Sequence, residues 1–533
     1  MSSRRLIVLA AACAAGVIAV PGTALAAGST PHPSVKRLVQ PTKLKGVDKA
    51  ILSGFSKRAT AARTAADSSL AFTATTTPSN GLYDVQLDVD VTGSTGTVSV
   101  TATWDGVADA PVTSAGDGTV SIGHTFSKLG DHTLTITVDD GAGVPVTQTG
   151  TVTPIGSDYT AYGPTRLLDT RSSKTTLKPH TAIKVKVGGN GGISADALAA
   201  VLNLTVTNPT VGGYITAYAD GTSRPTSSNV NFAAKQTVPN LSIVPVGGDG
   251  YVDLYNGSSG TVDLIADING YFSRTAAAGY TTVTPSRLVD TRKGTGATKA
   301  KIAANGSIAV QIAGKGGVPS GVTAVALNIT ATGGSNSGYL TAYPDGQAKP
   351  TASNVNYGAN QNIANAVIVP VGSDGKIRLA NGPGKPVDAL VDVSGYYSAS
   401  SKSAFLPVDP SRLVDTRSDG NGPIPAGGYE AFELGDGTSD QPTAFVLNAT
   451  VPTATGSGYL SVAPDPNTVD DYNNGTYKTL TPPSVSTLNF NKGQTVPNLV
   501  QASDGSTGIV DFWNMAGTQN NLVLDMFGVY LNY

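Results

Sequence analysis

The chain has 533 residues, 63 of them glycine, and a formal net charge of −2. Only two of its 37 acidic residues, Glu430 and Glu433, are glutamates. Glutamate is a good helix former and aspartate is not, so this skew and the many glycines argue against an extensively helical protein. The length allows roughly three or four domains. We therefore predict an all-β, multidomain chain.

The first 26 residues have the features of a signal peptide. Arg4 and Arg5 precede an apolar run, and the Ala-Leu-Ala sequence at 24–26 supplies small residues for cleavage. The run is too short to favour a retained membrane span, so we expect no membrane insertion after cleavage. The only cysteine, Cys13, lies within it. Cleavage before Cys13 would give a lipid-anchored protein, whereas cleavage after residue 26 leaves a mature chain without thiols or disulfides.

Residues 27–69 are expected to form a basic linker or pro-segment. Between residues 28 and 66 the sequence has eight Lys or Arg and one Asp. Such a segment could attach to anionic wall polymers or nucleic acid, or be a solvated spacer that is partly helical around VDKAILSGF. It has almost no aromatic residues to stack on bases, so we expect no nucleic-acid partner.

Residues 70–154 are predicted to form a β-sandwich. YDVQLDVDVTG, GTVSVTATWDG and HTLTITVDD alternate apolar and polar residues, as strands with one buried face do. The segment HTFSKLGDHTLTITVDDGAG at 124–143 resembles the closing half of a PKD domain, a small immunoglobulin-like sandwich. The longer Gly-Asp-Gly turn expected after WDG is missing, which leaves a generic immunoglobulin-like domain as the alternative. The resemblance implies a spacer or weak binding module and no catalysis.

Three similar segments follow, at 158–275, 278–400 and 404–533. They open with GPTRLLDTR, TPSRLVDTR and DPSRLVDTR, and they close with IADINGYF, LVDVSGYY and VLDMFGVY. Between these lie further matched blocks, of which GGYITAYADG and SNVNFAAKQTVPN are the first copies. Each segment is long enough for about eight short strands and its own core. We therefore predict three tandem β-sandwich modules of jelly-roll-like type.

As a set, these blocks resemble a module of secreted proteins in high-GC Gram-positive and related bacteria. Its pattern is Pro-x-Arg, two apolar residues and Asp-Thr-Arg, then Gly-Tyr-apolar-Thr, then Asp-apolar-x-Gly-Tyr-aromatic. The resemblance covers residues 158–533. It carries no established activity and implies a role in surface attachment or recognition.

The string Arg-x-x-Asp-Thr-Arg puts charges on both faces of an extended strand. In the second copy, Leu288 would share the buried face with Asp290 and Arg292. A buried carboxylate and guanidinium must be paired, because an unpaired buried charge costs several kcal/mol. Each module also closes on a strand with one Asp, so we predict a structural clasp in which the last arginine meets that aspartate. The clasp residues are Arg166, Asp169, Arg171, Asp267, Arg287, Asp290, Arg292, Asp392, Arg412, Asp415, Arg417 and Asp525. The alternative is an exposed site for sugar, carboxylate or Ca²⁺.

Asparagines also recur within apolar strand segments. They are Asn203, Asn328 and Asn448 in one block and Asn231, Asn356 and Asn489 in another. A buried strand asparagine commonly satisfies backbone groups at a bulge or sheet edge, so we expect this role, with ligand binding as the alternative.

Ligand-binding residues are sought where the modules differ. The late hairpin has Tyr255 in the first module and Trp513 at the equivalent position of the third. Exposed aromatics there could stack on a sugar ring, so both are candidate ligand-binding residues, with packing against a neighbouring unit as the alternative.

The third module also has an insertion at 465–483. Its Asp465, Asp470 and Asp471 could coordinate Ca²⁺, but their spacing fits no EF-hand, and a solvated loop is the alternative. We assign no other metal or cofactor.

Recognisable catalytic motifs are missing from the sequence. There is no Gly-x-Ser-x-Gly, His-Glu-x-x-His or phosphate-binding loop, and the modules contain one histidine, His180. We predict a secreted or extracellular, non-catalytic surface or matrix protein that could associate with the cell wall. The alternatives are a lectin-like binder of cell-wall or environmental polysaccharide and an orphan polysaccharide hydrolase.

Overall fold

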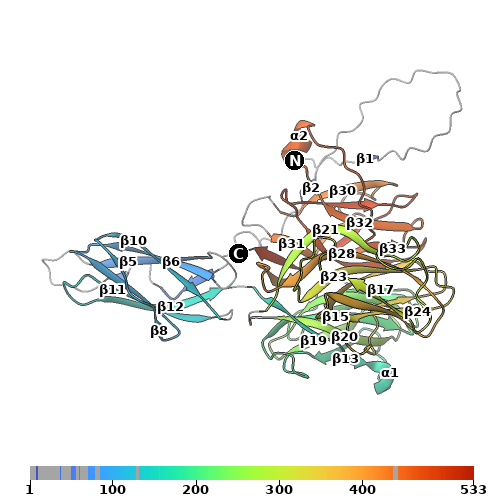
Figure 1. Cartoon of the computed structure of the whole chain (residues 1–533), viewed down its shortest axis with the longest axis horizontal. Helices are drawn as coiled ribbons and strands as arrows, with labels where there is room; N and C mark the ends of the chain where they lie inside the picture. Colours follow the sequence, from blue (N-terminus) through green and yellow to red (C-terminus); the bar gives the residue numbers. More distant parts are fainter. Residues whose placement is uncertain are drawn as a thin grey trace.

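The computed structural model describes residues 8–9, 36–37, 50–55, 59–60, 70–78, 84–127, 131–154, 156–275, 277–435 and 442–532. Strands dominate this part of the chain, and its helices are α1 (Thr170–Ser173) and α2 (Val469–Asn474). Within the described residues no helix is long and apolar enough to cross a membrane. The predicted all-β class is confirmed. Figure 1 shows a slender sandwich beside a larger head.

The slender part is a sandwich of two antiparallel sheets around one core. Buried side chains alternate with half-exposed ones along its strands, so each sheet turns one face to the core. One sheet has the order β10 (Gly118–Thr125), β6 (Asp84–Thr92), β5 (Ala71–Pro78) and β4 (Ala59–Thr60). The other has the order β3 (Ala50–Ser53), β12 (Val146–Pro154), β11 (His132–Asp139), β7 (Val98–Trp104) and β8 (Val107–Ala108), with β9 (Val112–Ser114) also on β7.

Two of these strands lie in the segment expected to be a linker. β3 pairs with β12, and β4 pairs with β5. Ala50–Ser53 is therefore a strand and not part of a helix, because pairing at the sheet edge satisfies its backbone groups. Two further short strands, β1 (Val8–Leu9) and β2 (Lys36–Arg37), pair with β30 (Gly428–Glu433) of the third module. Cys13 and the expected cleavage site lie outside the described residues.

Each of the three modules is an eight-stranded jelly roll made of two antiparallel sheets. Numbered within a module, the strands have the orders 1-8-3-6 and 2-7-4-5. We call these the inner and the outer sheet. The predicted jelly-roll-like modules are thus confirmed.

The strands of the modules have the following bounds. The first module has inner strands β13 (Asp158–Asp169), β20 (Asp263–Ser273), β15 (Ala197–Thr207) and β18 (Val238–Pro245), and outer strands β14 (Ala182–Lys186), β19 (Tyr251–Asn256), β16 (Gly213–Ala219) and β17 (Val230–Phe232). The second has inner strands β21 (Gly279–Asp290), β28 (Asp388–Ser398), β23 (Ala324–Thr332) and β26 (Ile363–Pro370), and outer strands β22 (Ser307–Gln311), β27 (Lys376–Asn381), β24 (Gly338–Pro344) and β25 (Val355–Tyr357). The third has inner strands β29 (Ser403–Asp415), β36 (Val523–Asn532), β31 (Pro442–Val451) and β34 (Val496–Ser503), and outer strands β30, β35 (Ile509–Asn514), β32 (Gly458–Pro464) and β33 (Leu488–Phe490).

The inner sheets are buried on both faces. Along β15, for example, ten of the eleven positions are buried. Leu202 and Leu204 belong to the core of the first module, whereas Ala199 and Val201 belong to a second core shared by all three modules. Such a near-continuous apolar run is typical of a strand covered from both sides.

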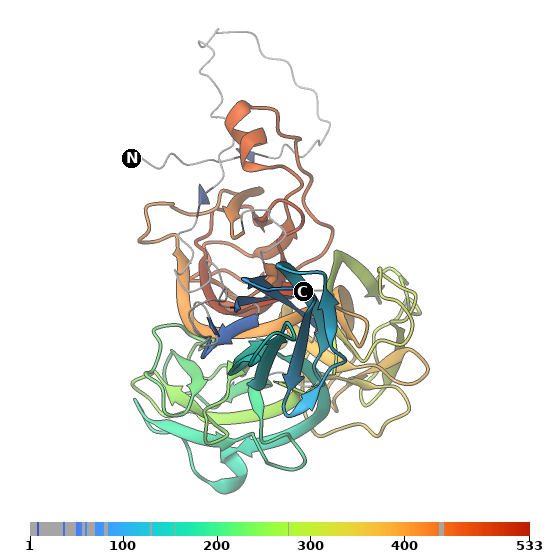
Figure 2. The same ribbon diagram turned by 90° about the vertical axis from the view of Figure 1, so that its left-hand side faces the viewer.

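The three modules pack around a common axis rather than standing as separate beads. Backbone contacts join the first module to the second, the second to the third and the third back to the first: Tyr159–Ala278, Tyr280–Ser403 and Phe405–Ser157. Figure 2 shows the three lobes side by side, with the N-terminal sandwich in front. The head is therefore a closed ring of three modules with pseudo-threefold symmetry.

Aromatic side chains fill the axis of this ring. Seven aromatic side chains there are less than 2% exposed: Tyr159, Tyr280, Tyr397, Tyr530, Phe272, Phe405 and Phe527. The hydroxyls of Tyr397 and Tyr530 lie 2.6 Å apart, and Gln501 donates to both at 2.7 Å. Burial of a large apolar side chain contributes about 1.5–3 kcal/mol, so this cluster is a substantial source of the attraction between modules.

Candidate functional site

A β-bulge changes which residues of the repeated charged string share a face. In the second module the register of β21 on β28 shifts between Arg287 and Val289, which leaves Arg287 opposite Asp392. The strand ends at Asp290, and Arg292 lies beyond it with its side chain 44% exposed. The expected core position of Arg292 is therefore wrong, because the bulge and the strand end break the simple alternation.

The first arginine of each string forms a row of polar residues across three inner strands. Arg287, Asp392 and Asn328 lie opposite one another on β21, β28 and β23. Arg287 Nε and Nη2 donate to the two carboxylate oxygens of Asp392 at 2.7 and 2.9 Å. The equivalent rows are Arg166–Asp267–Asn203 and Arg412–Asp525–Asn448. This bidentate arginine–carboxylate pair joins the first strand of each module to its last strand.

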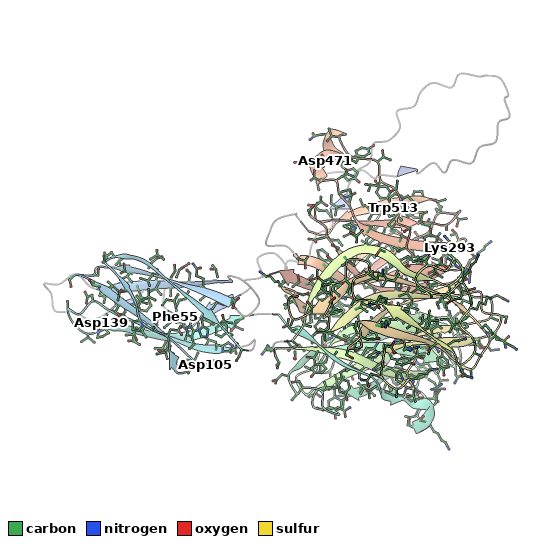
Figure 3. All side chains as sticks on the ribbon, in the orientation of Figure 1. Phe55, Asp105, Asp139, Lys293, Asp471 and Trp513 are labelled. Carbon is green, nitrogen blue, oxygen red and sulfur yellow. The ribbon has the colours of Figure 1, made fainter. Side chains whose placement is uncertain are left out.

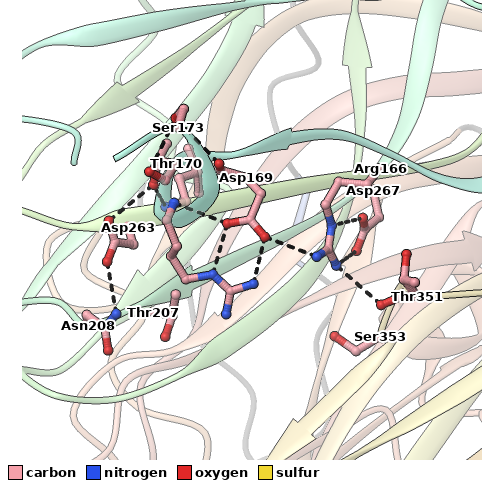
Figure 4. Close-up of polar contacts among 12 residues, drawn as sticks. Arg166, Asp169, Thr170, Ser173, Thr207, Asn208, Asp263, Asp267, Thr351 and Ser353 are labelled. Atoms are coloured by element: carbon pink, nitrogen blue, oxygen red, sulfur yellow. Dashed lines mark hydrogen bonds and ion pairs between the residues drawn. The ribbon is translucent and has the colours of Figure 1, made fainter. Parts of the chain in front are cut away.

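The closing aspartates thus meet the first arginine of each string, not the last. The expected pairing of Arg171, Arg292 and Arg417 with these aspartates is wrong. Arg171 instead donates to Asp169, two residues before it, from Nε at 2.9 Å and Nη2 at 2.7 Å (Figure 4). Hydrogen bonds from Arg171 lower the pKa of Asp169 to about 2. Arg292 and Arg417 hold Asp290 and Asp415 in the same way and lower the pKa of each carboxyl.

The strand asparagines of each row reach the next module. Asn203 Nδ2 donates to the carbonyl oxygen of Ser353 at 2.6 Å, and Asn448 Nδ2 donates to that of Ser228 at 2.7 Å. Asn328 makes the equivalent bond to Ser486. These asparagines do satisfy backbone groups, as expected, but the groups belong to the neighbouring module rather than to a bulge or sheet edge.

Three further asparagines complete a ring of amide contacts between modules. Asn365 Nδ2 donates to Asn203 Oδ1 at 2.8 Å, and its Oδ1 accepts the backbone N–H of Leu241 at 3.1 Å. Asn240–Asn448 and Asn498–Asn328 make the equivalent amide contacts, each 2.9 Å long. Sequence reasoning missed Asn240, Asn365 and Asn498. The signal was available, since each ends the repeated segment VPN, IAN or VPN.

The closing aspartates also touch the adjacent module. Asp525 Oδ2 accepts the backbone N–H of Ser228 at 3.3 Å, and Asp392 Oδ2 accepts that of Ser486 at 3.4 Å. Burial raises the pKa of Asp392, and the Arg287 fork opposes this rise. Each row therefore serves its own module and the interface at the same time.

The second set of asparagines has a more local role. Asn231 Oδ1 accepts the hydroxyl of Ser228 at 3.1 Å, and Asn356 Oδ1 accepts that of Ser353 at 3.0 Å. Asn489 Oδ1 is buried and has no hydrogen-bond partner among the described residues. Each of these asparagines lies opposite the tyrosine of the Gly-Tyr block on the outer sheet.

Neither candidate sugar-stacking aromatic has a free ring. Trp513 is 1% exposed and stacks on Tyr429 with the ring centroids 4.3 Å apart. Tyr255 is half-buried, with Arg224 Cζ 3.9 Å from its ring centroid and its hydroxyl 3.4 Å from His180 Nδ1. The assignment of Trp513 as an exposed ligand-binding residue is wrong, because its ring packs inside the third module. The ring of Tyr255 is covered by a guanidinium.

The insertion of the third module is an ordered element that packs on Trp513. Thr468 and Asp471 form a capping box at the start of α2, and Tyr472 is buried in one cluster with Trp513. Figure 3 labels Asp471 and Trp513 in this lobe. The insertion is therefore only in part the expected solvated loop: α2 and Tyr472 pack on the module, while Asp470 and most residues from 473 to 481 are exposed.

The aspartates of the insertion are used within the protein. Asp465 is 1% exposed and accepts hydrogen bonds from Tyr472 and Asn467, while Asp471 is held by Thr468. Burial and the nearby Asp465 carboxyl raise the pKa of Asp511. In the described ranges no three His, Cys, Asp or Glu side chains are placed to hold a metal ion.

A polar and aromatic cluster lies in the N-terminal sandwich. Trp104 stacks on His124 with the centroids 4.4 Å apart and donates from Nε1 to Asp109 at 2.8 Å. His132 is 3% exposed, with Nδ1 2.6 Å from Asp105. Burial lowers the pKa of His124. This arrangement fits a packed, hydrogen-bonded core better than a reactive site, because the imidazole of His132 is closed off from solvent.

No protein-family model matches the chain, and no curated protein sequence matches it. Three similar solved structures are SGBP-B of a Bacteroides ovatus mixed-linkage glucan utilization locus, in complex with a mixed-linkage heptasaccharide, the Sulfolobus Turreted Icosahedral Virus, and PNGF-II. SGBP-B is 12% identical, covers 90% of this chain and 99% of its own, and has a TM-score of 0.14. The virus protein is 11% identical, covers 66% of this chain and 85% of its own, and has a TM-score of 0.16. PNGF-II is 9% identical, covers 82% of this chain and 99% of its own, and has a TM-score of 0.13. With TM-scores this low, the fold assignment rests on the strand order of the chain itself.

Proposed function

We propose that this chain is a secreted, non-catalytic surface or matrix protein. Its three jelly rolls act as one rigid head, and a PKD-like sandwich at the N-terminal side spaces the head from its attachment. The observation that carries the proposal is the use of the repeated residues. The recurring Arg, Asp and Asn side chains bind one another and the next module, so the repetition preserves a scaffold rather than a reaction centre.

The carboxylates offer little support for a hydrolase. A glycosidase needs two carboxyl groups flanking the scissile bond, with room for a sugar between them. Asp267, Asp392 and Asp525 are each held by an arginine and are almost fully buried. The pair Asp465 and Asp511 lies under the packed aromatics of the insertion.

The test is to express the full chain in a Gram-positive host and follow both its location and its activity. We expect an extracellular protein whose N-terminus follows residue 26 and which releases no reducing ends from cell-wall or plant polysaccharides. Retention of the chain in the cytoplasm would contradict the location. Release of reducing ends that is lost in Asp465→Asn or Asp511→Asn, with the fold intact, would contradict the non-catalytic role.

A polysaccharide-binding function is the second candidate, and one observation favours it. A hollow of about 270 Å³ lies between the second and third modules and is lined by Arg287, Arg292 and Tyr459 among other polar residues. This volume is slightly below the usual range of ligand sites, about 300–1,000 Å³, so it is the polar lining of the hollow that favours this candidate. Binding to a polysaccharide panel that includes purified cell wall tests this candidate.

A further inference from the structure

We propose that the grooves between adjacent modules bind acidic polysaccharide chains, one chain segment per groove. The inference rests on the polysaccharide-binding candidate above and names its site and ligand class. In each groove the charged string of one module faces the Gly-Tyr hairpin of the next. The groove between the second and third modules, lined by Arg292, Tyr459 and Asn489, is the reference case.

The groove offers guanidinium donors to an anion, although each guanidinium is already paired with a carboxylate of its own module. Its charged lining residues are two arginines, Arg287 and Arg292, and the remaining polar ones are neutral hydroxyls and amides. Asp290 holds Arg292 through Nε at 2.9 Å and Nη2 at 2.8 Å. Nη1 of Arg292 makes no hydrogen bond with any described residue, and the side chain is 44% exposed. A guanidinium fixed on one edge and open on the other is a preorganised donor for a carboxylate.

The tyrosine and the amides suit a sugar ring beside that carboxylate. Tyr459 is half-buried, and its hydroxyl has no partner among the described residues. It lies opposite Asn489, whose Oδ1 also has no hydrogen-bond partner in the described part of the chain. An aromatic ring provides a stacking surface for the apolar face of a sugar, while hydroxyl and amide groups pair with its hydroxyls. A simple inorganic anion would use the arginine and leave the rest of the groove unused.

Equivalent contacts join the modules at the other two boundaries. The contacts of Asn203 with Ser353 and of Asn448 with Ser228 place the outer-sheet edge of one module against the charged string of the previous one. Arg166 Nη2 also lies 3.5 Å from the carbonyl oxygen of Thr351 (Figure 4). The tyrosines at the position of Tyr459 are Tyr339 and Tyr214.

Glycine holds two of these tyrosine rings in place. A Cβ added at Gly257 would lie 2.3 Å from the ring of Tyr214, and one at Gly382 would lie 2.8 Å from the ring of Tyr339. One ring face therefore rests on glycine backbone. Tyr214 is 36% exposed, whereas Lys349 Nζ lies over the Tyr339 ring, 5.5 Å from its centroid, so a sugar at that ring would have to displace the ammonium group. Three similar sites on one rigid head match a polymer that repeats the same acidic sugar, because linked sites raise avidity.

The test measures binding of oligogalacturonate, and of its fully methyl-esterified form, to the full-length mature protein by calorimetry. We expect the acid to bind with one oligomer per groove and the ester to bind at least ~10-fold more weakly, because esterification removes the charge. Tyr459→Ala and Arg292→Lys should each remove one site from the stoichiometry. The matched controls are Tyr251→Ala and Arg378→Lys, which alter a half-buried tyrosine and an ion-paired arginine outside the grooves.

The outcomes separate the site from the function. One variant combines Tyr214→Ala, Tyr339→Ala and Tyr459→Ala, and its melting curve shows whether it is folded. If this folded variant bound as the wild type does, the assignment of the site to the grooves would be wrong, while the polysaccharide-binding function would stand. Equal binding of acid and ester would overturn the ligand class. Failure of the wild type to bind oligogalacturonate, hyaluronan fragments or any polymer of the panel would overturn both the groove proposal and the polysaccharide-binding candidate.

Discussion

The inner and outer sheets of the three modules differ in how faithfully the chain repeats itself. The inner sheets carry the same Arg–Asp–Asn row in every module. On the outer sheets, Tyr255, Ala380 and Trp513 share one position, and Asp253, Arg378 and Asp511 share another. The inner rows must fit a neighbour on a closed ring, so a change in one copy affects two modules. The outer positions meet their own module or solvent, and they are free to diverge.

The same position can therefore have different chemistry on the outer sheets. In the second module Arg378 Nε donates to Asp345 Oδ1 at 2.9 Å, which forms a partly exposed ion pair. In the first module the equivalent residue is Asp253, whose pKa is raised by burial and by the Asp220 carboxyl. Such pairs can change without disturbing the ring, because they do not reach across a module boundary.

The largest effect should come from breaking an inner row. Asp392→Ala leaves the guanidinium of Arg287, which is 20% exposed, without its buried carboxylate, and removal of one partner of a buried pair costs about 3–5 kcal/mol. Asp345→Ala removes the outer partner of Arg378 and should cost at most about 1 kcal/mol, because exposed pairs contribute little. Urea unfolding of both variants checks the contrast, and equal losses would remove the distinction between the sheets.

Trp513→Ala should have the next largest effect and leave ligand binding unchanged. The indole is 1% exposed and stacked on Tyr429, so its removal should cost about 3 kcal/mol through a cavity beneath the insertion. Thermal unfolding measures the loss, with Tyr255→Ala as the half-buried counterpart that should lose less. If the wild type bound a polysaccharide and the folded Trp513→Ala variant did not, Trp513 would have to be assigned as a ligand-binding residue after all.

The amide ring should contribute somewhat less than either. Asn365→Ala leaves Asn203 Oδ1 and the N–H of Leu241 unpaired in a buried interface, which should cost about 2 kcal/mol. Asn362→Ala, at an exposed position just before the same strand, is the control and should be nearly neutral. Chemical unfolding compares the two, and a neutral Asn365→Ala would show that the axial aromatics alone hold the ring together.

The smallest effect on stability should come from Asp504, at a turn position that is buried in the third module but exposed in the other two modules. Burial raises the pKa of Asp504 to about 7, while its counterparts Asp249 and Asp374 are exposed. The folded state binds the proton of the Asp504 carboxyl more tightly than the unfolded state does. The stability that this protonation contributes is therefore fully present below about pH 4 and is lost as the pH rises through 7. Asp504→Asn should therefore stabilise the protein at pH 8 by about 1–2 kcal/mol and flatten the pH profile. Asp374→Asn should change nothing, and a parallel gain there would contradict the assignment.

Much of the fold followed from patterns in the sequence. The module boundaries came from blocks that return in order, and the strand count of each module came from the length of its segment. The partner of each arginine did not follow, because one bulge before Val289 moves Arg287 onto the face of Asp392. The fate of Trp513 did not follow either, since the insertion that covers it folds by a local capping box and a buried tyrosine.

The ring of modules was missed although a signal for it existed. Strands such as AVLNLTVT are apolar on both faces, and a two-sheet sandwich exposes one face of each sheet. A third layer was therefore needed to cover the second face, and the neighbouring modules supply it. An asparagine in the middle of such an apolar run marks a point where the contact with the neighbouring module needs a hydrogen-bond donor and acceptor.

The most direct test of the closed ring is hydrogen exchange on the full chain with Asn365→Ala. If the three modules form one cooperative unit, loss of this amide in the second module should lower the protection of inner-strand amides in all three modules alike, including β36, which forms no hydrogen bond with Asn365 among the described residues. Loss of protection confined to the strands around Asn365 would contradict the account and return the head to three independent jelly rolls.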